Sequence, residues 1–141
     1  MGIADIVGYQ ITRANLAGLA NFERAVTGPF KLRPVEFTIL QLLHEGQCTT
    51  PSQLSKELQM TPPSVSVWLD KLTERRLIRR SKGDTDGRTQ HLQLTDTGAQ
   101  LTARAHEALL KSEQQFMSAL SPGERVLLLE ILHKLCAKAA A

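Results

Sequence analysis

Hydrophobic residues recur at spacings of three and four over both ends of this chain, which is the period of an amphipathic helix. The first such run predicts a helix over residues 3–27, ended by Gly28–Pro29. Two more helices are predicted over 97–120 and 122–139, and a capping box over Ser121–Glu124 opens the second of them. The last is apolar around much of its circumference, and a chain of 141 residues has few places to bury it. We therefore expect the terminal helices to pack against a second copy of the chain.

The middle of the chain predicts shorter elements with clear boundaries. A helix is expected over 34–45, where Gly46 stops it. Thr50 and Thr61 are each followed by proline, which is typical of a helix N-cap and the first helical position. The two short helices that begin there fit a helix-turn-helix. Strand-like segments are expected at 77–80 and 91–94, and a further short strand at 47–49.

These elements define the expected fold class, which is mainly α with a small β-wing. Residues 1–141 are expected to form one subunit. Its DNA-binding lobe is a winged helix-turn-helix over 34–95, and residues 1–30 and 96–141 form a helical dimerisation region.

Positive charge is concentrated beside the second helix of this motif. Between residues 61 and 90 there are seven cations and four acids, an excess of +3 that equals the formal net charge of the whole chain. The cations are Lys71, Arg75, Arg76, Arg79, Arg80, Lys82 and Arg88. Such a local excess is the electrostatic footprint expected of a protein that contacts phosphates.

The overall composition narrows the class of protein. Hydrophobic and charged residues make up 42% and 22% of the chain, which is typical of a globular domain. Aromatic residues, at 4%, are too scarce for a stacking platform that binds single-stranded nucleic acid. The sequence has no signal peptide pattern and no apolar run that could span a membrane. We therefore expect a cytoplasmic protein with no membrane partner.

The helix that begins at Thr61 has a polar face that suits contact with DNA. Opposite its apolar stripe lie Pro63, Ser64, Ser66, Val67 and Lys71. Short hydroxyl side chains let a helix approach base edges closely enough to exchange hydrogen bonds. A lysine on this face reaches a phosphate, which positions a protein without reading sequence. We predict that these residues and Thr61 lie at the DNA.

The turn between the two strand-like segments carries further candidates. Arg88 lies near the tip of a tight turn, and an arginine in a narrow minor groove senses its width and negative potential. Asp84 and Asp86 are expected to brace Arg88 and the hairpin through local hydrogen bonds. Lys82 and Thr85 complete the predicted set of DNA-contacting residues.

The order of these motifs resembles the MarR family of winged helix-turn-helix regulators. The resemblance spans essentially the whole chain. Its most specific part is the D-x-D-x-R wing over 84–88, followed by a strand and the T-x-x-G helix start at Thr95 and Gly98. The resemblance implies a homodimer that binds a near-palindromic operator. It also implies a recognition helix in the major groove and the wing arginine in the minor groove.

The resemblance further implies roles for single residues. Ser64 and Ser66 are expected to approach bases or phosphates, whereas Val67 stands where the family often has arginine. A contact with a thymine methyl group would replace the missing guanidinium. In this family a small effector, often an aromatic or phenolic acid, commonly weakens DNA binding. Tyr9 and Arg13 of the first helix are the candidates to line its pocket.

The sequence predicts no metal site, cofactor or catalytic set. His133 and Cys136 lie three residues apart on one helix but have no matching pair, and the other histidines are scattered. Cys48 is expected to be a small buried hydrophobic residue, although a redox role for either cysteine is left open. The chain has no nucleotide-binding loop and no nucleophile motif, so we expect no enzyme activity.

The expected function is that of a sequence-specific transcriptional regulator. It would be a ligand-responsive repressor that acts as a homodimer on double-stranded DNA. The alternative is a winged-helix protein-interaction module that keeps the fold without specific DNA binding. The effector, the operator, the regulated genes and the direction of regulation are left open.

Overall fold

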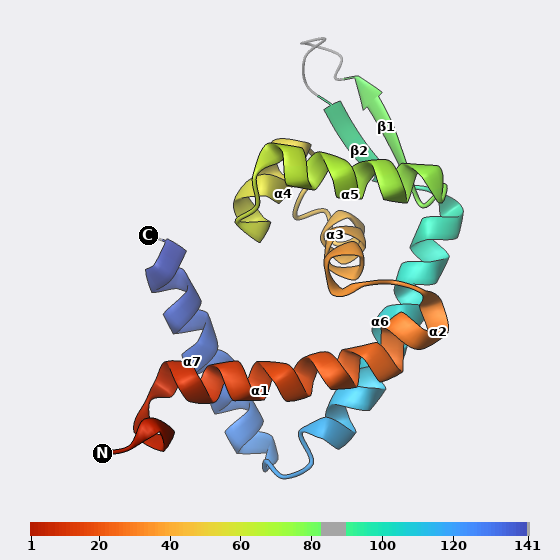
Figure 1. Cartoon of the computed structure of the whole chain (residues 1–141). Helices are drawn as coiled ribbons and strands as arrows, with labels where there is room; N and C mark the ends of the chain where they lie inside the picture. Colours follow the sequence, from red (N-terminus) through yellow and green to blue (C-terminus); the bar gives the residue numbers. More distant parts are fainter. Residues whose placement is uncertain (83–89, 141) are drawn as a thin grey trace. The chain divides into compact units, whose positions relative to one another are not determined.

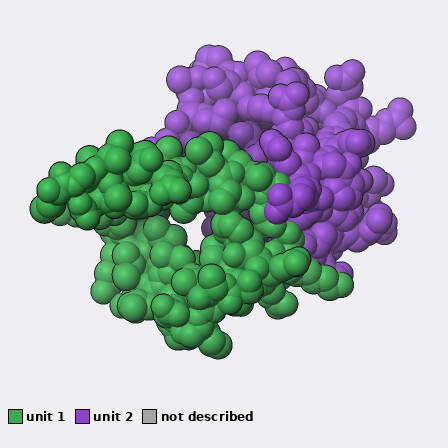
Figure 2. Space-filling model, turned by 60° about the horizontal axis from the view of Figure 1, so that its bottom comes forward, with its two compact units in different colours: residues 1–21, 110–141 green, residues 22–109 purple. Residues whose placement is uncertain are grey.

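The computed structural model describes residues 1–82 and 90–140, which fall into two compact units (Figure 2). Unit 1 is formed by residues 1–21 and 110–141, and unit 2 by residues 22–109. Most described residues are helical, and the described strands form one antiparallel pair. This architecture confirms the predicted fold class. No helix in the described part of the chain is long and apolar enough to cross a membrane.

Unit 2 contains the helix-turn-helix and its hairpin (Figure 1). In chain order its elements are a π-helical turn (Glu23–Thr27), α2 (Gly28–Phe30), α3 (Pro34–His44), α4 (Pro51–Leu58), α5 (Pro62–Glu74), β1 (Ile78–Lys82), β2 (Gln90–Leu94) and the first part of α6 (Asp96–Phe116). In the hairpin Ile78 lies opposite Leu94, and Lys82 lies opposite Gln90. The predicted helix-turn-helix and hairpin are therefore both confirmed.

The core of unit 2 is formed by the apolar stripes of these helices and the inner face of the hairpin. The large apolar side chains with 2% exposure or less are Val26, Leu32, Ile39, Leu40, Leu54, Val65, Leu69, Leu72 and Ile78. Phe22 and Phe37 pack edge to face beside them, with ring centroids 5.7 Å apart. Complete burial of so many large side chains holds α5 and the hairpin on a rigid base.

Unit 1 differs from unit 2 because many apolar side chains on its helices are exposed. It contains a short 3-10 turn (Ile3–Asp5), α1 (Val7–Phe22), the end of α6 and α7 (Pro122–Ala140). No residue over 122–138 of α7 is buried. Its exposed apolar side chains include Val126, Leu127, Leu129, Ile131 and Leu135. Helix α7 is therefore apolar around much of its circumference, as predicted. Its apolar side chains are exposed to solvent in this unit.

The predicted caps of the short helices are confirmed. The Thr50 hydroxyl accepts the backbone N–H of Gln53 (3.2 Å) at the start of α4. The Thr61 hydroxyl accepts the backbone N–H of Ser64 (3.4 Å) at the start of α5. In both helices proline takes the first position, where no N–H is needed. The start of the recognition helix is thus set by local chemistry.

Helix α7 begins with the predicted capping box. The Ser121 hydroxyl accepts the backbone N–H of Glu124 (3.2 Å), and the Glu124 carboxylate accepts the backbone N–H of Ser121 (2.9 Å). The backbone and hydroxyl hydrogen bonds from Ser121 lower the pKa of Glu124. The box is therefore complete when Glu124 is ionised, and it is lost as the pH falls through that lowered pKa.

The predicted first helix over 3–27 is wrong at both ends. The 3-10 turn at residues 3–5 is separate from α1, because Ile6 is extended. At the other end the chain does not stop at Gly28–Pro29 but continues helically to Phe30. A π-helical turn precedes the proline, and proline is tolerated in the first turn of the helix that follows. The helical path ends at Lys31, which takes a left-handed φ of 56°.

The predicted strand over 47–49 is also wrong. These residues form no strand, and a single backbone hydrogen bond joins the Leu92 N–H to the Thr49 carbonyl oxygen (2.8 Å). One hydrogen bond is too few to make a ladder. It nevertheless ties the outer edge of β2 to the segment that precedes α4.

Arg76 takes a left-handed conformation (φ 59°) directly after α5, where glycine is usually favoured. We expect Arg76→Gly to raise the free energy of unfolding by about 0.5–1 kcal/mol, because the steric cost of this φ outweighs the entropy of glycine. Urea unfolding followed by circular dichroism measures the change. Arg79→Gly, in strand β1, is the control and should lower stability. An equal loss of stability in both variants would show that the left-handed conformation of Arg76 carries no steric cost.

Candidate nucleic-acid interface

The turn between α4 and α5 fixes the geometry of the helix-turn-helix. Gln59 takes a left-handed φ of 52°, and the Met60 N–H donates to the Ser55 carbonyl oxygen (3.1 Å). The Ser55 hydroxyl donates in turn to the Met60 carbonyl oxygen (2.5 Å). Ser55 therefore closes the turn from both sides. This role could not be predicted from the sequence, because a serine inside a short helix resembles any surface serine.

The predicted recognition face of α5 is exposed along its length. Exposed residues on this helix include Pro63, Ser64, Ser66, Val67 and Lys71, and Thr61 is exposed at its start. Val67 is 52% exposed, although it is apolar. The face thus combines short hydroxyls with one methyl-rich side chain, a set that can reach base edges and thymine methyl groups.

Lys71 is held against its own helix. Its ammonium group lies 4.6 Å from the ring centroid of Trp68, which is half-buried. A cation over an aromatic face is attracted by the ring quadrupole. Lys71 is therefore partly ordered by its own helix, which would lower the entropy lost in any contact that it makes.

Arg75 at the end of α5 is bound to the start of α3. Its guanidinium donates to the Lys31 carbonyl oxygen (2.8 Å) and to the Glu36 carboxylate (3.2 Å). Glu36, whose side chain is 8% exposed, also accepts the Arg33 N–H (3.0 Å). A buried carboxylate requires such a partner. Arg75 therefore anchors the recognition helix and is not a free cation.

A second ion pair joins α5 to the hairpin. The Arg80 guanidinium of β1 donates to the Asp70 carboxylate of α5 at 2.9 Å. The side chains are 25% and 68% exposed, respectively. The predicted excess of charge is consequently distributed unevenly. Within the described residues, Arg76, Arg79 and Lys82 are exposed and have no ion-pair partner, whereas Arg75 and Arg80 are neutralised.

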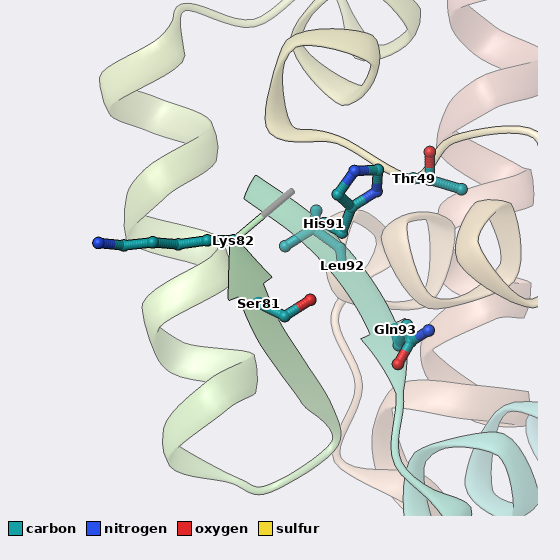
Figure 3. Close-up of a pocket in the computed structure, with 6 residues that line it drawn as sticks. All are labelled: Thr49, Ser81, Lys82, His91, Leu92 and Gln93. Atoms are coloured by element: carbon teal, nitrogen blue, oxygen red, sulfur yellow. The ribbon is translucent and has the colours of Figure 1, made fainter. Parts of the chain in front are cut away.

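The hairpin carries a small polar pocket on the side of Thr49 (Figure 3). Its volume is about 290 Å³, and it is lined by Thr49, Ser81, Lys82, His91, Leu92 and Gln93. In the close-up Lys82 points away from the other labelled side chains, toward α5. The described residues of the lining contain hydroxyl, imidazole and amide groups and no carboxylate, so they offer donors to an anionic oxygen.

Four predicted wing residues lie outside the described residues. They are Asp84, Thr85, Asp86 and Arg88. The strands that flank them end at Lys82 and resume at Gln90.

The two candidate effector residues lie together in unit 1. The Arg13 guanidinium is 5.9 Å from the ring centroid of Tyr9, and both residues are exposed. A groove of about 580 Å³ in this unit is lined by other residues of α1, among them Gln10, Ile11 and Ala14. Tyr9 and Arg13 are not among its lining residues. The groove is mainly apolar, and its walls are completed by Phe116 at the end of α6 and by Leu128 and Leu132 in the middle of α7.

Cys48 is buried, as predicted. It is 4% exposed, and burial raises the pKa of its thiol, with a smaller contribution from the negative charge of Glu57. The thiolate is the reactive form of cysteine, so both effects make Cys48 unreactive. No cluster of potential metal ligands occurs in the part of the chain that the structure describes.

The reactivity of Cys48 gives a direct check on this environment. In a Cys136→Ser variant, which leaves Cys48 as the sole thiol, we expect thiol–disulfide exchange with a small reagent to be at least about 100-fold slower in the folded state than in urea. The rate is measured with a chromogenic disulfide reagent at neutral pH. Similar rates in the two states would mean that Cys48 is accessible, and would favour the redox-switch alternative.

Together the capped α4–α5 pair, the exposed hydroxyl face of α5 and the adjoining hairpin define a winged helix-turn-helix protein. Residues 32–89 match the model of the MarR family. The chain belongs to this family of transcriptional regulators.

Similar proteins are consistent with that membership. A protein described as the putative transcriptional regulatory protein for the hcr operon of Thauera aromatica is 28% identical over 133 residues, which is 94% of this chain and 80% of that protein. The repressor NicR of Pseudomonas putida is 24% identical over 133 residues, 94% of this chain and 84% of that protein. The structure of the repressor CouR bound to a 23-mer DNA duplex has a TM-score of 0.87 and 27% identity, covering 95% of this chain and 94% of that one.

Proposed function

We propose that this protein is a transcriptional repressor that binds a near-palindromic operator as a homodimer. The observation that carries the proposal is the exposed Ser64–Ser66–Val67 face of α5, capped by Thr61 and rigidly supported on the core of unit 2. Such a face fits the major groove of double-stranded DNA. Two similar proteins, NicR and CouR, are named as repressors, which supports the same direction of regulation.

We propose that one group of contacts reads the DNA sequence and that another group positions the protein on the DNA. Ser64, Ser66 and Val67 read base edges, and Val67 contacts a thymine methyl group. Pro63 lies against them at the start of the helix. Lys71 and Lys82 bind phosphates, which gives affinity that falls with salt but carries no sequence information.

The homodimer is supported by the uncovered apolar surface of unit 1. Exposed apolar side chains on α7 at positions 127, 131 and 135 recur every four residues and so share one face. Ile6, Val7 and Leu16 add exposed apolar surface at the other end of the chain. Monomeric proteins rarely leave such faces in water, and a second copy with the same faces would cover them.

We propose that Arg88 enters the minor groove from the wing, with Thr85 beside it and Asp84 and Asp86 as its supports. Arg88→Ala is expected to weaken operator binding by about 1–3 kcal/mol and to reduce the preference for AT-rich flanks, because a narrow minor groove attracts a guanidinium. Fluorescence anisotropy with AT-flanked and GC-flanked duplexes measures both effects. A variant that bound every probe as tightly as the wild type would remove the wing from the interface.

An effector is proposed to act through unit 1. The Arg13 guanidinium suits the carboxylate of an aromatic or phenolic acid, and the adjacent Tyr9 ring suits its aromatic part. Binding that favours a different arrangement of the dimer would lower the affinity for DNA.

The proposal is separated from a protein-interaction module by the salt dependence of DNA binding. A specific regulator should prefer one duplex over a scrambled copy, and its affinity should fall with a slope of about −0.9 per phosphate contact. A gel-shift titration over a salt series measures both quantities. Equal, weak binding to all duplexes would favour the interaction module.

A further inference from the structure

We propose that the Asp70–Arg80 ion pair is a positioning device that sets the angle of the β1–β2 hairpin relative to the recognition helix. This inference rests on the proposed function, because it concerns the relative orientation of the two elements that are proposed to read DNA. Asp70 and Arg80 belong to neither the predicted base-reading set nor the wing tip. They act on specificity through the groups that they hold in place.

The first support is the place of the pair in the fold. Asp70 lies on α5 one helical turn after Ser66, so it shares the face that reads DNA. Arg80 lies in β1, opposite Leu92, with Ile78 two residues before it. Ile78 and Leu92 are 2% and 3% exposed, so this face of the hairpin is turned toward the core and α5. The pair is therefore a side-chain tie between the two elements.

The second support is that stability does not explain the pair. Asp70 is 68% exposed, and ion pairs in such positions contribute little to the free energy of folding. The Nε of Arg80 is buried and has no hydrogen-bond partner among the described residues, which is itself unfavourable. An apolar side chain at position 80 would pack beside Ile78 and Leu92 without that cost. The ion pair therefore matters for the position of the hairpin and not for the free energy of folding.

The third support comes from the charge of Asp70. An exposed carboxylate on the recognition face repels phosphates, so on charge alone its removal should strengthen binding to any DNA. If Asp70 positions the wing, its removal should instead weaken discrimination at the bases next to the wing. The two roles therefore predict effects of opposite kind, which makes the proposal testable with one substitution and its control.

Glu74 provides the matched control. It is exposed on α5 one turn after Asp70, and it has no ion-pair partner among the described residues. Glu74→Gln removes the same charge from the same helix without breaking a tie to the hairpin. The test variants are Asp70→Asn, Arg80→Gln, and the double exchange of Asp70→Arg with Arg80→Asp, which reverses the pair at constant net charge.

The probes are three duplexes: the one that the wild-type protein selects from a random pool, a copy with GC in place of AT at its flanks, and a scrambled copy. We expect Asp70→Asn and Arg80→Gln each to reduce the preference for AT over GC flanks by about tenfold, with little change in melting temperature. The exchanged pair should restore the preference to within about threefold. Glu74→Gln should leave the preference unchanged.

Two results would overturn the inference. The first is an unchanged flank preference in both single variants. The second is an Asp70→Asn protein that, like Glu74→Gln, binds all three duplexes more tightly by the same factor. A wild-type protein that did not distinguish the selected duplex from the scrambled one would instead contradict the proposed function, and the inference would fall with it.

Discussion

Replacing Gly98 with alanine is expected to lower the free energy of unfolding by about 2–4 kcal/mol, although alanine is the better helix former. Gly98 is buried in the first turn of α6, and its N–H donates to the Thr95 hydroxyl (3.0 Å). A Cβ at this position would overlap the carbonyl oxygen of Leu77 and lie 2.9 Å from its carbonyl carbon. These are backbone atoms, which cannot move aside as a flexible side chain can.

The consequences of Gly98→Ala extend to the wing. Thr95, which caps α6, also donates its hydroxyl to the Arg76 carbonyl oxygen (2.7 Å), and its N–H donates to the Leu77 carbonyl oxygen (3.0 Å). Separation of α6 from Leu77 would therefore strain the hairpin where β1 begins and where β2 ends. Urea unfolding gives the stability, and Gly123→Ala is the control, since its Cβ meets nothing within 4 Å. Similar stability in the two variants would show that α6 does not require this close approach.

Ile131→Glu is expected to weaken the proposed dimer by at least about 100-fold, because an ionised carboxylate loses its hydration in an apolar interface. Ile131 is 45% exposed, and Leu127 and Leu135 lie one turn to either side on the same face of α7. At micromolar concentration the variant should sediment as a monomer. Operator affinity should fall with it, because two recognition helices would no longer be linked.

Gln115→Glu is the control for that substitution. Gln115 is an exposed polar residue of α6 in the same unit, so the added charge is equal but falls on a polar surface. Sedimentation velocity should show a dimer for the wild type and for Gln115→Glu. A dimer formed equally well by Ile131→Glu would place the proposed interface elsewhere.

Features determined by neighbouring residues could be predicted from the sequence. The caps at Thr50, Thr61 and Ser121 were identified because each involves groups only three residues apart. The buried stripe of α5 and the hairpin followed from hydrophobic periodicity. The exposed hydroxyl face of the recognition helix followed from the same stripe, since it lies opposite.

Predictions from local sequence were wrong where the backbone takes a conformation that its residues do not usually favour. Gly28–Pro29 normally ends a helix, but a preceding π-helical turn carries the chain through it. Arg76 takes a left-handed conformation that is typical of glycine. In both places tertiary packing decides the backbone, and a single sequence contains no local sign of it.

Ties between distant residues could not be predicted at all. Arg75 and Glu36 are 39 positions apart, and Asp70 and Arg80 are ten apart on different elements. The run of cations predicted a basic surface, yet the structure shows that two of its arginines hold elements together. Only the folded arrangement separates the cations that face solvent from those that serve the scaffold.

The central claim is tested most directly by footprinting the protein on the DNA that flanks its own gene, over a salt series. The account predicts protection of two symmetric half-sites about 10 base pairs apart, centre to centre, with protection that weakens steeply as salt rises. Repeating the footprint with aromatic acids would report an effector as a loss of protection. The absence of a protected site at low salt, or uniform coverage of all DNA, would contradict the account.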